Sequence, residues 1–170
     1  MKARTLIPLC LSLSLLGCAM PTQFRPFTEP KEGPMARVRV VSNHYVIAIP
    51  GRDCLNAGPE QAGTVLSGWL TSKGYRGRAI GMPYPPADPG TAAEIMVAAN
   101  EPITISMMNS VPNGGGCDVS GSFTPEEGRD YEVRAQMERG GNYCSIKLVE
   151  LAPVLRPIPL NRRLSCKKAP

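Results

Sequence analysis

The sequence predicts an all-β protein, a small antiparallel β-sandwich with an irregular middle region, and three observations lead to this class. Apolar and polar residues alternate along several short segments, as they do in strands with one dry face. Glycines and prolines, 17 and 18 in number, separate these segments at close intervals. No convincing long segment repeats its apolar residues with the period of a helix. Short alternating strands with frequent turns are typical of a sandwich.

The first two strands are expected over residues 36–41 and 44–49. Their apolar residues are Val38, Val40, Tyr45, Ile47 and Ile49, which alternate with Arg37, Arg39, Val46 and Ala48. The turn dipeptide Pro50-Gly51 ends the second strand.

The middle of the domain, from residue 50 to residue 92, is expected to be irregular because prolines and glycines interrupt it. It includes a strand or short helix over 64–71, a short strand over 78–82 and a loop over 83–90. An irregular segment on a rigid β scaffold is a common place for a binding site.

Alternation returns in the second half and predicts further strands around 95–97 and over 103–107, 117–123, 130–138 and 143–150. Turn-forming residues stand between them at Asn100-Glu101, 114–116, 125–128 and 139–142. Each of these strands has one polar and one apolar face, so an antiparallel arrangement is expected.

The N-terminus has the features of an export signal. Lys2 and Arg4 precede an apolar stretch over 5–16 that is too short for a permanent membrane helix. The stretch ends in Leu15-Leu16-Gly17-Cys18, which resembles the lipobox of bacterial lipoproteins. The resemblance implies that Cys18 receives a diacylglycerol and a further acyl chain, which together anchor a protein durably.

The alternative is ordinary cleavage after Ala19, which would give a secreted protein without lipid. With Cys18 lipidated, the absence of an Asp after it favours the periplasmic face of the outer membrane over the inner membrane. The expected organisation is a signal peptide over 1–17, an anchor and Pro-rich tether over 18–35, the sandwich over 36–152, and a basic tail over 153–170. Phe24 and Phe27, in the tether, could dip into the membrane interface or dock on the domain.

Charge argues against a nucleic-acid partner. The formal charge falls from +5 to +3 when the signal leaves with its two cations. The remaining charge is small and scattered, and an exported protein does not meet nucleic acid.

The sequence has six cysteines, of which Cys10 leaves with the signal and Cys18 is used for lipid. The other four are Cys54, Cys117, Cys144 and Cys166, and an even number in an oxidising compartment predicts two disulfides. A zinc site would need closely spaced cysteine pairs, and no two of these four lie close together in the sequence.

Three pairings are open, and strand geometry favours one of them. Cys117 and Cys144 both fall on inward positions, but in a flat meander they would be two strands, or almost 10 Å, apart. A bridge is possible if the chain crosses to the other sheet at 125–128, where Tyr131 occupies the place of a tyrosine corner. Cys54 with Cys166 follows by elimination and would tie back the tail.

Candidate catalytic residues are weak. The single histidine, His44, could serve a nucleophile such as Cys54 or Ser42, but Cys54 is expected in a disulfide. Glu126, Glu127 and Asp130 are expected at a solvated turn, with a weak calcium site as the alternative. No cofactor and no metal is therefore expected.

The candidate binding surface combines Trp69, Tyr75 and Tyr84, which belong to the irregular middle region. Trp69 stands between Leu66 and Leu70, so a core position is its alternative role. In general design the chain resembles small bacterial envelope lipoproteins with immunoglobulin-like or transthyretin-like domains.

The resemblance implies a non-enzymatic binding or assembly module, whose partner is another envelope protein or a cell-wall component. Relatives of that design include accessory subunits of secretion machines and inhibitors of lysozymes. Two alternatives are therefore an inhibitor of a cell-wall hydrolase, with 83–90 as the inhibitory loop, and a periplasmic hydrolase that uses His44.

Overall fold

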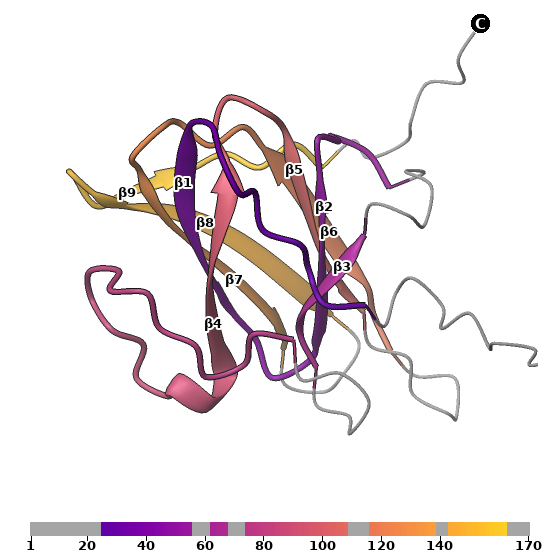
Figure 1. The fold of residues 1–170 in the computed structure, drawn as a ribbon. Helices are drawn as coiled ribbons and strands as arrows, with labels where there is room; N and C mark the ends of the chain where they lie inside the picture. The colour runs from indigo at the N-terminus through magenta and orange to yellow at the C-terminus, as the bar shows by residue number, and fades with distance from the viewer. Residues whose placement is uncertain (1–24, 56–61, 68–73, 109–115, 139–142, 163–170) are drawn as a thin grey trace, which may run out of the picture.

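The computed structural model describes residues 25–55, 62–67, 74–108, 116–138 and 143–162, and in them two sheets pack face to face (Figure 1). One sheet has the strand order β4-β1-β7-β8-β9 and the other β3-β2-β5-β6. The strands are β1 (Met35–Val41), β2 (Tyr45–Pro50), β3 (Gly63–Leu66), β4 (Ala92–Ala98), β5 (Ile103–Met108), β6 (Val119–Phe123), β7 (Asp130–Met137), β8 (Cys144–Ala152) and β9 (Arg156–Ile158). The predicted all-β sandwich is confirmed.

Neighbouring strands run antiparallel with one exception, the central pair of the larger sheet. There β1 and β7 are parallel, with Val38 opposite Tyr131. Between β1 and β7 the chain builds all four strands of the smaller sheet, and between β3 and β5 it also adds β4 to the edge of the larger sheet. A long excursion of this kind is what a parallel pair requires.

The core lies between the sheets and is formed by alternate residues of their strands. In β2 the core residues are Val46 and Ala48, opposite Met107 and Ile105 of β5. Ile47 and Ile49 point to the other face of β2, although both are buried there too. Since β2 is apolar on both faces, alternation alone could not tell which set meets the opposite sheet.

The segment expected as a strand over 78–82 is not one, and this prediction was wrong. Its residues have no regular secondary structure and lead instead into the loop that precedes the 3₁₀ turn η2 (Pro89–Thr91). The segment crosses the outer face of the larger sheet, where the Ile80 and Met82 N–H groups bond to the Glu94 side chain rather than to a strand backbone. Of the element expected over 64–71, the first residues form β3, and 68–71 lie outside the described residues.

The predicted tether is too long, because the chain already packs on the domain at Arg25. The Phe27 side chain is 2 % exposed, and its N–H donates to the Thr64 carbonyl at 2.9 Å. The Thr64 N–H in turn donates to the Arg25 carbonyl at 2.6 Å. Burial of a phenylalanine contributes about 1.5–3 kcal/mol, which explains why this proline-rich segment is held. Phe24 lies outside the described residues.

The domain also extends beyond its predicted end at residue 152. Residues of β9 pair with β8, and Asn161 exchanges two backbone hydrogen bonds with Ser122 of β6. The Leu160 side chain covers Gly121, where a Cβ would lie 3.0 Å from it. The first part of the basic tail therefore belongs to the sandwich.

A disulfide between Cys117 and Cys144 joins the two sheets, as the strand geometry predicted. Cys117 lies just before β6 and Cys144 begins β8, and their Cα atoms are 5.8 Å apart. Tyr131 forms the expected corner, because its hydroxyl accepts the Glu126 N–H at 3.0 Å. Cys54 is also disulfide-bonded, and Cys166, its predicted partner, lies outside the described residues.

Other parts of the chain cover three of the four sheet edges. Segment 77–78 bonds to β4, and residues 25–27 bond to β3. Asn161 bonds to the free edge of β6. The remaining edge is β9, a short strand with Pro157 at its centre, which has no N–H to donate. The described sheets therefore offer little room for another chain to add a strand.

Candidate binding surfaces

A buried arginine lies on the outer face of the larger sheet. Arg39 of β1 is 0 % exposed and lies in register between Glu94 of β4 and Glu132 of β7. These three residues, here called the Arg39 cluster, form one row across three strands. The sequence pattern places Arg39 on the polar, solvent-facing side of its strand. Its burial therefore requires another part of the chain to cover the side chain and carboxylates to neutralise its charge.

The guanidinium of Arg39 uses all five of its N–H groups. Nε and Nη2 donate to one oxygen of Glu94 at 3.0 and 2.7 Å, and Nη1 donates to Glu132 at 3.1 Å. The other two donate to backbone carbonyls, Nη1 to Tyr84 at 2.6 Å and Nη2 to Pro83 at 2.9 Å. A buried cation is stable only when it is paired and its donors are satisfied, and this one meets both conditions.

The second carboxylate oxygen of Glu94 accepts hydrogen bonds from the chain just before Pro83 and Tyr84. Its Oε2 accepts the Ile80 N–H at 2.6 Å and the Met82 N–H at 3.3 Å. Burial by itself would raise the pKa of Glu94, but the hydrogen bonds from Ile80, Arg39 and Met82 outweigh burial and lower it. The carboxylate is thus charged and holds the segment from one side while Arg39 holds it from the other.

The Arg39 cluster therefore fixes residues 78–86, here called the Tyr84 segment, against the sheet. Figure 1 shows the chain before β4 on the side of the larger sheet that faces away from the smaller one. Tyr84 has a φ of 54°, which a residue with a side chain rarely adopts, and its side chain is 64 % exposed. The hydrogen bond from Arg39 to its carbonyl offsets part of the cost of that conformation.

Of the two described members of the predicted binding surface, Tyr84 is the one that the structure presents to solvent. Tyr75 is half-buried: its hydroxyl donates to the Phe27 carbonyl at 2.8 Å, and Arg78 lies 4.8 Å above its ring. These contacts give Tyr75 a role in holding the N-terminal segment. Trp69 lies outside the described residues.

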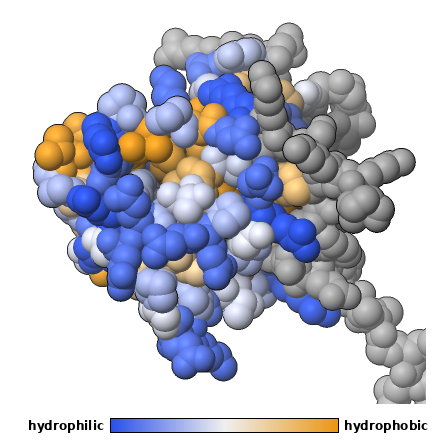
Figure 2. Space-filling model, turned by 90° about the horizontal axis from the view of Figure 1, so that it is seen from above, coloured by the Kyte–Doolittle hydropathy of each residue, from blue (hydrophilic) through white to orange (hydrophobic). Residues whose placement is uncertain are grey.

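A second exposed feature is the hairpin between β8 and β9. Val154 and Leu155 at its tip are 64 % and 63 % exposed. Figure 2 shows hydrophobic surface gathered on the side of the molecule where this hairpin lies in Figure 1. Behind the tip, buried Glu150 pairs with Arg156 at 2.6 Å and with Arg129 at 3.4 Å, which fixes the base of the hairpin.

The residues considered for catalysis do not form a nucleophilic set. His44 lies in the turn between β1 and β2, and its N–H donates to the Ser42 hydroxyl at 3.1 Å. That hydroxyl in turn contacts the Met107 sulfur at 3.5 Å. Cys54 is engaged in a disulfide, so it has no thiol to activate.

The acidic turn does not form a shared site in the described structure. Asp130 binds the Arg37 guanidinium through both oxygens, at 2.6 and 2.7 Å. Glu126 is an exposed partner of Arg129. In the described parts of the chain, no three His, Cys, Asp or Glu side chains are grouped as metal ligands would be.

No helix within the described ranges has the length and hydrophobicity that a membrane crossing requires.

The Arg39 cluster could be found only in part from sequence. The alternation in β1 marks Arg39, but nothing in the spacing of Glu94 and Glu132 indicates that both stand beside it.

In comparisons with known proteins, no family model, curated protein or solved structure matches this chain.

Proposed function

We propose that this protein is a lipid-anchored component of the bacterial cell envelope, and that it binds a protein partner through the Tyr84 segment without catalysing a reaction. The binding role rests on one observation: the fully buried Arg39 donates two hydrogen bonds to the backbone of the loop that exposes Tyr84. An arginine–carboxylate cluster is a weak source of stability compared with apolar packing, so its value here is in fixing a conformation. A fixed loop loses little entropy when it binds.

The anchor rests on the lipobox Leu15-Leu16-Gly17-Cys18, a feature of the sequence that lies outside the described residues. Replacing Cys18 with alanine should release the protein from the membrane fraction, and mass spectrometry of the native protein should show acyl chains on Cys18.

The binding role is tested by a photo-crosslinking residue placed at position 84 in intact cells. We expect a discrete adduct with one envelope protein. The matched control is Tyr143, which has nearly the same exposure, 65 %, and lies just before β8. Equal labelling from the two positions would show that the Tyr84 segment is an ordinary surface.

A second candidate function is inhibition of a cell-wall hydrolase, favoured by the exposed tyrosine on a held loop. An inhibitor loop must keep its shape in the enzyme cleft, which the Arg39 cluster would ensure. We expect the protein to slow lysis of cell walls by lysozyme, and Tyr84→Ala to lose at least ten-fold in potency while Tyr143→Ala does not. Unchanged lysis at excess protein would remove this candidate.

A further inference from the structure

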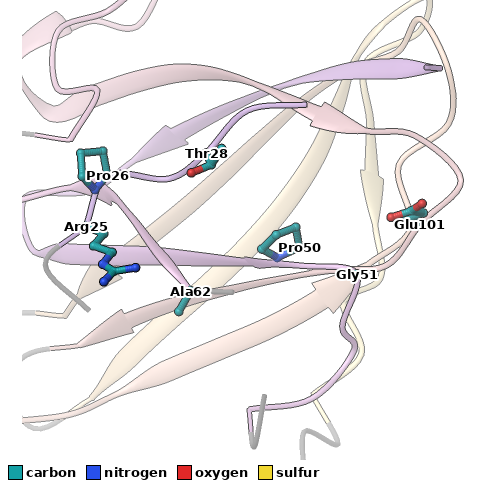
Figure 3. Close-up of a pocket in the computed structure, with 7 residues that line it drawn as sticks. All are labelled: Arg25, Pro26, Thr28, Pro50, Gly51, Ala62 and Glu101. Carbon is teal, nitrogen blue, oxygen red and sulfur yellow. The ribbon is translucent and has the colours of Figure 1, made fainter. Parts of the chain in front are cut away.

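A groove of about 400 Å³ lies between the N-terminal segment and the ends of β2 and β5 (Figure 3). Its size is in the range of small-ligand sites. Apolar walls come from Pro26, Pro50 and Ala62, and Thr28 adds a hydroxyl. Arg25 lies at one end and Glu101 at the other, with Pro50 between them.

The two ends of the groove are held on a rigid frame. On the Arg25 side, the backbone bonds to Thr64 and buried Phe27 pin the segment. On the Glu101 side, β2 pairs with β5 up to Pro50 and Ile103. The Arg52 N–H continues this pairing by donating to the Pro102 carbonyl at 3.1 Å. The positions of the two backbone segments that carry the charges are therefore set by the fold.

Both charges are available to a ligand. Arg25 and Glu101 are exposed, and neither side chain forms an ion pair or hydrogen bond in the described structure. This differs from the carboxylates Glu94, Asp130 and Glu150, which are each bound to arginine.

We infer that this groove binds a short extended peptide with free ends, its carboxylate at Arg25 and its ammonium group at Glu101. A guanidinium matches a carboxylate through two parallel hydrogen bonds. The two charges lie at opposite ends of the groove, with Pro50 between them, so they suit a ligand that carries its own two charges at its two ends. A short extended peptide has this form, because its carboxylate and its ammonium group are separated by the length of its backbone. No residue of the Tyr84 segment lines the groove, so this inference and the proposed function fail independently.

The test is titration calorimetry of the mature protein with tri-alanine at low ionic strength. We expect saturable binding that weakens at least ten-fold when the peptide is N-acetylated, and likewise when it is C-amidated. In Arg25→Gln the affinity should fall and amidation should then have no further effect. In Glu101→Gln the same should hold for acetylation. Glu127→Gln and Lys147→Gln, both exposed and outside the groove, should bind as the native protein does.

Three results would overturn the inference. The first is no saturable binding at millimolar tri-alanine, and the second is equal binding of the blocked peptides. The third is tighter binding of glycerophosphoethanolamine than of tri-alanine, which would assign the groove to a lipid headgroup. Because Arg25 and Glu101 have exposed side chains with no partner among the described residues, all variants should keep the native melting temperature.

Discussion

At the scale of single residues, Arg39 is the side chain that holds the Tyr84 segment in place. It is the largest fully buried side chain of the described protein, and it is charged. Its neighbours in the strands supply both carboxylates, and the Tyr84 segment supplies two carbonyls. The alternation along β1 predicts that Arg39 faces solvent, because the segment that buries it follows about 40 residues later in the sequence.

Replacing Arg39 with methionine should lower the free energy of unfolding by about 3–5 kcal/mol, because Glu94 would be left buried without its cation. Urea denaturation measures this change. Arg134→Met is the matched control: Arg134 also pairs with Glu132, but its side chain is 50 % exposed, so its loss should cost less than about 1 kcal/mol. Similar losses in both variants would contradict the role given to Arg39.

Acid should weaken the Arg39 cluster in a defined direction. The pKa of Glu94 is lower in the folded protein than in the unfolded chain, so its contribution is complete above the ordinary pKa of 4.5 and is lost as the pH falls through the folded value. Unfolding followed between pH 7 and pH 3 should show this decline. Glu94→Gln should be less stable at pH 7 but have a shallower decline below pH 4.5. An identical slope in the two proteins would argue against the ion pair.

At the scale of elements, the strands could be predicted and the segments that cover them could not. Alternation predicts seven of the nine described strands to within a few residues, since each buries one face. It does not identify β3, which is expected only as a strand or a short helix in the irregular region, or β9, which has three residues and a central proline. The sequence also assigns residues 25–34 to a tether and leaves open whether Phe27 docks on the domain, because nothing local shows that Phe27 fits beside Gly63.

Phe27→Ala should therefore destabilise the domain by about 3–5 kcal/mol, the usual cost of removing a buried phenylalanine. If residue 27 belonged to an unpacked tether, the same substitution would leave the free energy of unfolding unchanged. Thr28→Ala, at the next and exposed position, should stay within about 0.5 kcal/mol of the native protein. Thermal unfolding of the three proteins compares them directly.

At the scale of the whole molecule, the sandwich is joined by its core and by the bridge between its sheets. Cys117 and Cys144 were predictable as a pair because both fall on inward positions, and because one corner moves the chain between sheets. The candidate site was less predictable: of three aromatic residues chosen from composition, Tyr84 is exposed on a held loop and Tyr75 is half-buried. The groove could not be predicted, since it unites four turns and strand ends far apart in the sequence.

Replacing both Cys117 and Cys144 with alanine should lower stability by about 2–4 kcal/mol, the effect expected for closing a loop of this length, with a sequence separation of 27. Denaturation in guanidinium without reductant measures the loss. Native-like stability in the double variant would show that the bridge is incidental to the fold.

The most direct test of the central claim is hydrogen exchange of the Ile80 and Met82 amides in the native protein. Both amides lie in a loop without regular structure, yet they donate to Glu94 beneath the Tyr84 segment. If the Arg39 cluster holds this segment rigidly, the two amides should exchange as slowly as those of the central strand β1. Exchange at the rate of an open loop would contradict the claim that the protein presents Tyr84 on a fixed surface.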